Sequence, residues 1–146
     1  MLDSFENEMI EKIEEVIVNN LPKERSDQLF IQSSYDTTVQ ILTCYEENKE
    51  LLQFLLKSSY SSFQTKLRNK LKLVFTNLIF PILGELEYEI PTDLFTIAFT
   101  SISLSLAEYA YQSETPINIE KSANLLFNIV LEGPAKTLGL IKDGDI

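Results

Sequence analysis

Two long apolar segments near the C-terminus constrain the fold of this chain more than any other feature. Residues 94–111 and 119–130 carry apolar side chains at intervals of three and four, the spacing of a helix face. The first segment is dense in Ala, Ser and Thr, whereas the second is dominated by large residues. Neither contains a recognisable catalytic group. Paired helices of this kind favour an assembly and sensing domain over an enzyme.

The remainder of the chain also predicts helices. Its 146 residues include only 4 Gly and 5 Pro, and 45% of them are hydrophobic, which fits one domain with a sizeable core. Apolar stripes predict helices that begin near residues 2, 34, 48, 61, 91 and 118, while the segment 23–33 fits either a loop or a short helix. We therefore expect an all-α bundle of about six helices over residues 1–133, followed by a loosely packed tail at 134–146.

Local signals place several helix ends. Asn48 and Asn118 are expected to cap the helices that follow them. Ser61 and Gln64 have the spacing of a capping box, in which each side chain satisfies a free amide of the other residue. Pro81 is expected to kink or end the helix that begins near Ser61, because proline lacks the amide that continues it. The acidic segment 85–89 is expected to form the next turn, and Gly133 followed by proline to stop the last helix.

The composition excludes several functions. The chain has no histidine and a single cysteine, Cys44, so neither a Ser-His nor a Cys-His nucleophile can be assembled, and a zinc site is not expected. A calcium or magnesium site made of carboxylates alone remains open by composition. The Asp-rich calcium-loop pattern, however, is missing. We expect no catalytic residues, no metal and no cofactor. The residues around Cys44 are acidic, which disfavours a thiolate and favours a structural role over thiol sensing.

The charge balance bears on partners and location. The formal net charge of -10 makes the surface repel phosphate backbones, so the chain is not expected to bind DNA by itself. There is no charge-free apolar run of membrane-spanning length, and the N-terminus is acidic, unlike a secretory signal. We expect a cytoplasmic protein with no membrane contact.

Motif order along the chain resembles a known family. Residues 45–52 have the sequence Tyr-Glu-Glu-Asn-Lys-Glu-Leu-Leu, Phe63, Leu67 and Leu71 follow at intervals of four, and Ile90-Pro91 opens the closing pair of helices. Together these features resemble the C-terminal domain of regulators of the tetracycline-repressor (TetR) family, in the branch common in low-GC Gram-positive bacteria. The likeness extends to Gly133 and rests on order and spacing more than on any single motif.

The resemblance implies a function and an assembly. The early helices would surround a pocket for a small apolar effector, and the last two would form a four-helix dimer interface with the same helices of a second copy. DNA would be contacted only through an N-terminal helix-turn-helix domain, which has no counterpart in this sequence. One departure is the end of the penultimate helix, where relatives often carry Trp and this chain has Tyr109-Ala110-Tyr111.

Two sets of residues are candidates for these sites, and each has an alternative. The effector set combines inward-facing aromatic, aliphatic and polar residues; it comprises Phe5, Met9, Tyr35, Cys44, Tyr45, Phe63, Leu67, Phe75 and Asn77. The alternative is that these residues only fill a core. The homodimer set combines small residues, which allow close helix approach, with large apolar ones; it comprises Ala98, Phe99, Ile102, Ser105, Leu106, Tyr109, Leu126, Phe127 and Val130. The alternative function is a standalone helical protein-protein interaction module.

Overall fold

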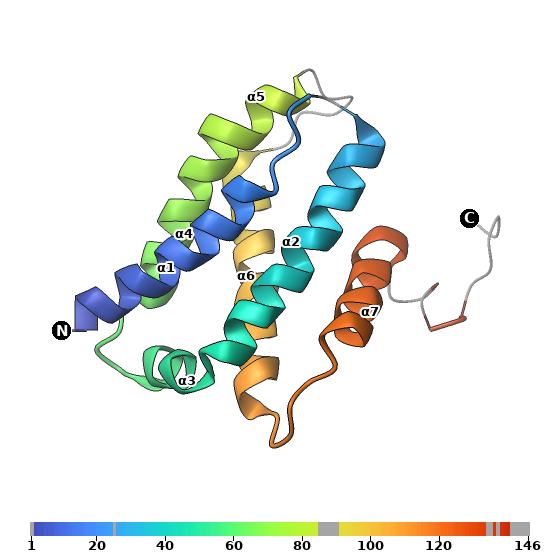
Figure 1. The fold of residues 1–146 in the computed structure, drawn as a ribbon. Helices are drawn as coiled ribbons and strands as arrows, with labels where there is room; N and C mark the ends of the chain where they lie inside the picture. The colour runs from blue at the N-terminus through green and yellow to red at the C-terminus, as the bar shows by residue number, and fades with distance from the viewer. Residues whose placement is uncertain (1, 25, 85–90, 134–135, 137, 141–146) are drawn as a thin grey trace.

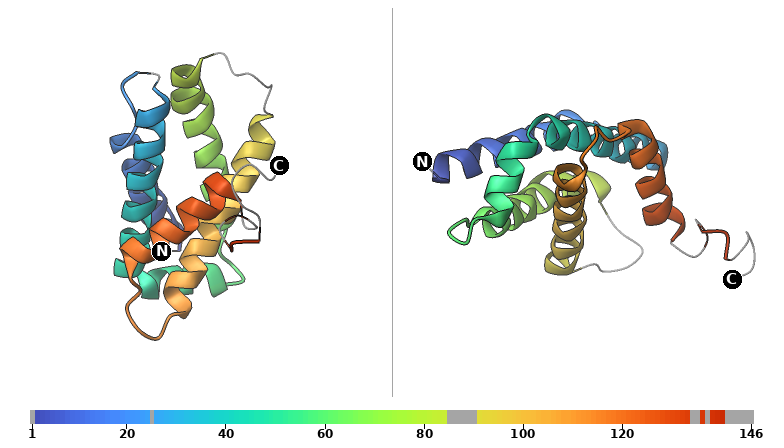
Figure 2. Two further views of the ribbon diagram at one scale, coloured as in Figure 1. Left: turned by 90° about the vertical axis from the view of Figure 1, so that its right-hand side faces the viewer. Right: turned by 90° about the horizontal axis from the view of Figure 1, so that it is seen from below.

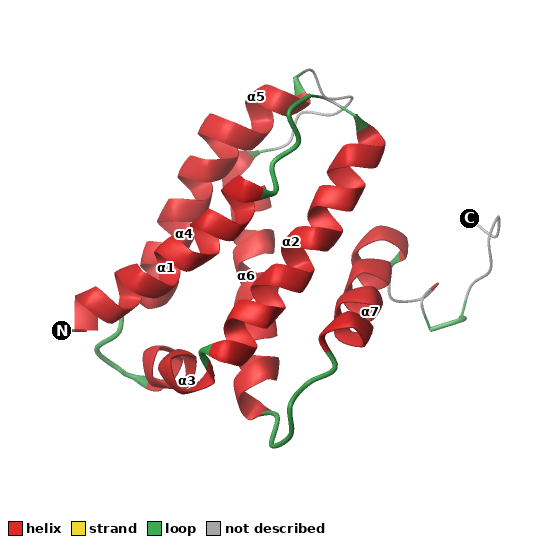
Figure 3. Ribbon diagram, viewed as in Figure 1, coloured by secondary structure: helices red, strands yellow, loops and turns green. Residues whose placement is uncertain are grey.

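A computed structural model describes residues 2–24, 26–84, 91–133, 136 and 138–140, and these residues form an all-helical fold (Figure 1, Figure 3). The elements, in chain order, are α1 (Leu2–Asn19), α2 (Asp27–Glu47), α3 (Lys49–Lys57), α4 (Phe63–Val74), η1 (Phe75–Ile79), α5 (Phe80–Leu83), α6 (Thr92–Gln112) and α7 (Ile119–Glu132). Because α4, η1 and α5 follow one another without a break, the described residues form six helical rods. The expected all-α class is confirmed.

The rods are arranged around α2 and α4. Helix α1 packs against α2, α3 and α4, and α6 packs against α2, α3, α4 and η1. Helix α7 packs against α2 (Figure 1). Seen from below, α6 and α7 project from the same side of α2 and diverge from each other (Figure 2). The predicted turn at 85–89 and most of the predicted tail lie outside the described residues; within the tail, Leu138 and Leu140 are exposed.

Side-chain caps account for two helix starts. The Ser26 hydroxyl accepts the amide of Leu29 at 3.3 Å, so α2 begins at Asp27, and the segment that fitted either a loop or a helix is largely helical. The predicted cap at Asn118 is confirmed, because its side-chain oxygen accepts the amide of Lys121 at 3.0 Å. The predicted stop at Gly133 is confirmed as well, with a φ of 87° that favours glycine.

Two other predicted caps are wrong. Asn48 forms no side-chain cap on α3; its amide nitrogen instead donates back to the carbonyl of Cys44 at 2.7 Å. The capping box of Ser61 and Gln64 is also not formed, because α4 begins at Phe63 and its cap residue is Ser62. The Asn48 side chain instead donates to the Cys44 carbonyl, and the Ser61 hydroxyl donates to the Glu6 carboxylate.

The start of α4 is capped from α1 by Glu6. This carboxylate is fully buried and accepts the Ser62 amide at 2.6 Å, the Ser61 hydroxyl at 3.0 Å and the Lys66 ammonium at 3.1 Å. A carboxylate at a helix N-terminus satisfies free amides and complements the positive end of the helix dipole. Residues distant in sequence therefore fix α1 to the beginning of α4.

Pro81 neither ends nor breaks its helix. It lacks the amide that would bond to the carbonyl of Asn77 in a regular helix. The chain accommodates this by a wider turn, in which the amide of Phe80 bonds to the carbonyl of Phe75, five residues back. The helix then continues to Leu83 and ends at Gly84, whose φ is 69°. The π-helical segment η1, which precedes Pro81, thus rotates the side chains that follow it relative to their positions in a regular α-helix.

Candidate functional site

The interior brings together five of the nine residues predicted to bind an effector. Met9, Tyr45, Phe63, Leu67 and Phe75 are each at most 5% exposed and belong to one apolar cluster. They come from α1, α2, α4 and η1, so the cluster lies where these elements meet. Both the pocket hypothesis and the core hypothesis require this convergence.

The other four predicted effector residues lie at the edge of the cluster or outside it. Phe5 and Cys44 are half-buried and pack against its periphery. Tyr35 meets Phe127 of α7 edge to face, with ring centroids 5.6 Å apart. Asn77 is exposed on η1. The structure therefore does not bring all nine side chains into one site.

The environment of Cys44 fits a structural thiol. Burial raises the pKa of the Cys44 thiol and the nearby Glu47 carboxylate raises it further, while Lys12 and the hydrogen bond from Asn48 oppose them. The net direction is upward, so the neutral thiol is favoured.

The buried face of α6 is polar or small. Thr96, Thr100, Ser103, Ala107 and Ala110 follow the helical spacing and are all at most 8% exposed. The Ser103 hydroxyl pairs with the hydroxyl of the fully buried Tyr45 at 2.5 Å. Burial raises the pKa of Tyr45 well above its ordinary value, so its hydroxyl remains protonated and able to donate.

We expect Tyr45→Phe to lower the free energy of unfolding by about 1 kcal/mol, because it removes one buried hydrogen bond without opening a cavity. Ser103→Ala should have a similar effect. Because both variants remove the same bond, the double variant should cost less than the sum of the two, which denaturation in urea can measure. Strictly additive effects would contradict a direct Tyr45–Ser103 bond.

Four large apolar residues of α6 are exposed on its outer surface, while Phe95, Leu104 and Leu106 pack against the core. Leu94 is 63% exposed, Ile97 48%, Phe99 41% and Tyr109 51%. A surface helix of a globular protein normally shows the opposite arrangement, with large apolar residues inside and polar ones outside. Part of α6 therefore departs from this arrangement, with Thr96, Thr100 and Ser103 buried and Leu94, Ile97, Phe99 and Tyr109 exposed.

Helix α7 shows the same feature. Among its described residues only Ala123 is fully buried. Leu125 is 49% exposed, Ile129 40%, Val130 51% and Leu131 54%. We refer to these four residues, together with Leu94, Ile97, Phe99 and Tyr109 of α6, as the α6–α7 apolar face.

The two helices of this face meet at one end and then diverge. The Tyr109 and Ser122 hydroxyls lie 3.5 Å apart. Helical spacing places Ile102 on the same side of α6 as Tyr109, and Leu126 on the same side of α7 as Ser122. Over their described residues, however, the backbones of α6 and α7 do not pack against each other (Figure 2). Ile102 and Leu126 are both half-buried.

Three of the nine predicted dimer residues, Phe99, Tyr109 and Val130, belong to this face, whereas Leu106 packs against the interior cluster and Phe127 against Tyr35 of α2. Five are exposed: Ala98, Phe99, Ser105, Tyr109 and Val130. Four are half-buried: Ile102, Leu106, Leu126 and Phe127.

Five further apolar residues of α6 and α7 are exposed and were not in the predicted dimer set; they are Leu94, Ile97, Leu125, Ile129 and Leu131. The sequence shows apolar residues on every side of α6, and α7 carries Leu125 and Ile129 beside its predicted stripe. Periodicity alone could not show which side faces outward.

Charges are absent from the central part of the face. Residues 94–107 of α6 and 122–131 of α7 contain no Asp, Glu, Lys or Arg. The nearest acid before the α6 segment, Asp93, is paired with Lys72 at 2.6 Å. A chain with a net charge of -10 therefore keeps an uncharged surface on two neighbouring helices.

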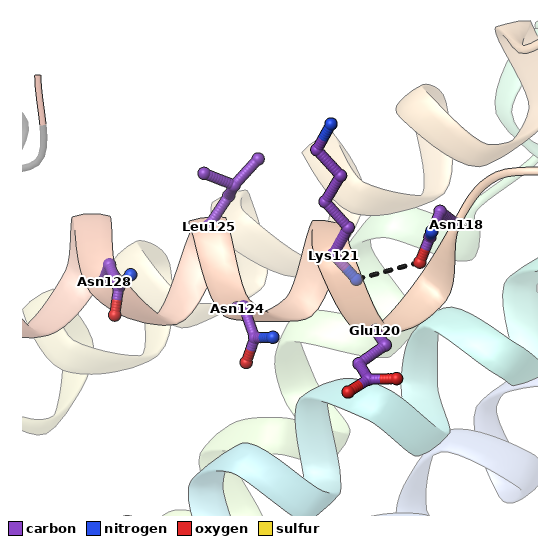
Figure 4. Close-up of a pocket in the computed structure, with 6 residues that line it drawn as sticks. All are labelled: Asn118, Glu120, Lys121, Asn124, Leu125 and Asn128. Atoms are coloured by element: carbon purple, nitrogen blue, oxygen red, sulfur yellow. Dashed lines mark hydrogen bonds between the residues drawn. The ribbon is translucent and has the colours of Figure 1, made fainter.

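An open hollow lies along the polar side of α7 (Figure 4). Its lining comprises Asn118, Glu120, Lys121, Asn124, Leu125 and Asn128. All six come from α7 and the residue before it, and none belongs to the predicted effector set. It is therefore a surface depression separate from the interior cluster.

No group of three or more His, Cys, Asp or Glu side chains in the described part of the chain lies close enough to hold a metal ion. None of the described helices combines the length and apolar character that a membrane crossing requires. Comparison with known proteins found no matching family model, no matching curated protein and no matching solved structure.

Proposed function

We propose that this chain is the dimerisation and effector-sensing domain of a transcriptional regulator of the tetracycline-repressor type, and that it pairs with a second copy through α6 and α7. One observation carries the pairing part of the proposal. Helix α6 buries Thr96, Thr100 and Ser103 and exposes Leu94 and Ile97. Large apolar residues that remain exposed on neighbouring helices mark surfaces that bind another protein.

Charge explains why a second copy suits this surface. Two chains that each carry a net charge of -10 repel each other unless the charges stay out of the contact. The uncharged segments of α6 and α7 provide such a contact. Exposed small residues at Ala98 and Ser105 would allow the helices of two copies to approach closely.

The sensing part of the proposal has separate support. It rests on the resemblance of the chain up to Gly133 to the family. The meeting of Met9, Tyr45 and Leu67 in the interior is required by this proposal and equally by a packed core. In this mechanism a small apolar effector would favour one arrangement of the early helices, and the attached DNA-binding domains of the dimer would change their separation. Such regulation requires a difference in effector affinity between the two arrangements.

Sedimentation equilibrium over a dilution series tests the pairing. We expect the wild-type chain to be a dimer at micromolar concentration, and Ala98→Glu with Ser105→Glu to raise the dissociation constant at least 100-fold, about 3 kcal/mol. Both positions are exposed, so the fold of each protomer should be retained. Gln53→Glu with Gln64→Glu, at exposed positions on α3 and α4, adds the same two charges elsewhere and serves as the control.

The outcomes separate the two candidate functions. A dimer that only the α6 variant dissociates would support the regulator domain. A wild-type chain that stays monomeric at tens of micromolar would overturn the proposed pairing and favour a module that binds a different protein.

A further inference from the structure

Four phenylalanines form a continuous cluster between the core and the outer surface of α6. Phe75 of η1 is 5% exposed and belongs to the core. Its ring centroid lies 5.1 Å from that of Phe95 and 5.5 Å from that of Phe99, and the rings of Phe95 and Phe99 lie 4.4 Å apart. Phe80 contacts Phe95 at 5.4 Å. Phe99, at 41% exposure, is the member that reaches the α6–α7 apolar face.

The π-helical turn creates this cluster. In a regular helix, residues five positions apart point about 140° away from each other, because each residue turns the chain by about 100°. The wider turn of η1 bonds the amide of Phe80 to the carbonyl of Phe75 and brings these two side chains toward one side. Both rings then contact Phe95. Since Pro81 removes the amide that a regular helix needs here, the sequence itself explains the turn.

The contacts hold Phe99 in place although much of its ring faces solvent. Edge-to-face packing on Phe75 and close packing with Phe95 restrict the ring before any partner arrives. A side chain that is already ordered loses little entropy when it is covered by a partner. Rigid aromatic residues that are apolar and exposed are typical anchors of protein interfaces.

We propose that Phe99 is the anchor through which a second copy of this chain binds, and that Phe75 acts as its positioning residue from the core side. This inference rests on the proposed function, because it assumes that the copies pair through α6. The partner is a second copy because Phe99 lies within the uncharged segment 94–107, which two strongly acidic chains can bring together without opposing carboxylates. A substitution of Phe75 in the core would then weaken the pairing of the two copies.

The test compares two phenylalanines that are both buried in the same rod. Phe75→Leu removes the ring under Phe99, whereas Phe63→Leu removes a ring that is 1% exposed at the start of α4. Sedimentation equilibrium of the full chain should show at least a tenfold rise in the dimer dissociation constant for Phe75→Leu and a change within twofold for Phe63→Leu. Circular dichroism and urea denaturation would establish that both variants are folded and similarly destabilised.

A second variant makes the test independent of core stability. Phe99→Leu alters an exposed ring, so the protomer should remain folded, and its dissociation constant should also rise at least tenfold. Phe75→Leu combined with Phe99→Leu should add little, because both changes act on one contact. A wild-type dimer whose dissociation constant changes equally in the Phe75 and Phe63 variants, or not at all in Phe99→Leu, would overturn the anchor while leaving the pairing intact. A wild-type monomer would overturn the proposed function itself.

Discussion

Replacing Leu67 with Ala is expected to lower the free energy of unfolding by about 3 kcal/mol. Leu67 has no exposed surface and lies in the apolar cluster with Phe63 and Leu71. Truncation of such a side chain loses its transfer free energy and leaves a cavity that the neighbours only partly fill. Urea denaturation of the wild-type chain and the variant at one fixed protein concentration measures the effect, because any contribution from dimerisation is then compared under the same conditions.

The matched control is Leu73→Ala. Leu73 lies on the same helix, but it is 56% exposed, so its truncation should cost less than about 1 kcal/mol. The comparison also decides between the two hypotheses for the interior. A cost near 3 kcal/mol for Leu67→Ala indicates a packed core at this position, whereas a cost as small as that of Leu73→Ala would indicate a residue that already lines open space.

The fold class followed from the sequence because helical signals are local. Stripes at intervals of three and four, the cap at Asn118 and the stop at Gly133 each involve residues within one or two turns. The start of α2 was harder to predict from the sequence, because its cap at Ser26 lies within a segment that lacks a clear apolar stripe. Local patterns thus predicted most helices and some of their ends.

The orientation of α6 could not be predicted for a physical reason. Apolar residues occur on all sides of this helix, so periodicity does not indicate which side faces inward. The structure buries Thr96, Thr100 and Ser103 against the neighbouring helices, and the hydroxyl of Ser103 finds its partner on α2. That partner, Tyr45, is 58 residues away in the sequence, and a single sequence does not reveal such a pair.

Candidate sites depend even more on distant contacts. The sequence indicated Phe75 and Phe99 separately, as an effector residue and a dimer residue. The structure brings their rings together through the turn that Pro81 causes. Proline predicted a disturbance at this point, but the choice between a break, a kink and a wider turn depends on how the flanking aromatic residues pack.

The second large effect is expected from Glu6→Gln, which should lower the free energy of unfolding at pH 7 by about 2 kcal/mol. Glu6 has no exposed surface, and it accepts hydrogen bonds from Ser61, Ser62 and Lys66. Glutamine keeps the size of the side chain but has one acceptor oxygen and no charge. Lys66 is one-third exposed, so solvent screens part of its interaction, and we therefore expect less than the full loss of a deeply buried ion pair.

The pH dependence of this effect has a defined sign. Burial alone would raise the pKa of Glu6, but the hydrogen bonds from Lys66, Ser61 and Ser62 outweigh burial and hold the pKa below its ordinary value of 4.5. A depressed pKa means that the ionised carboxylate stabilises the fold above pH 4.5 and that this contribution is lost as the pH falls through the folded-state pKa. The difference between the wild-type chain and Glu6→Gln should therefore be constant near neutral pH and decrease below pH 4.5.

Urea denaturation between pH 7 and pH 3 measures this difference directly. Glu11→Gln removes the same charge from an exposed position of α1 and should change the free energy of unfolding by less than about 0.5 kcal/mol at every pH. If the difference for Glu6→Gln stayed the same down to pH 3, the ionised carboxylate would not be the stabilising form. If the two variants behaved alike, Glu6 would not be what attaches α1 to the start of α4, and the position of α1 would have to depend on the apolar contacts of Met9 and Ile13 instead.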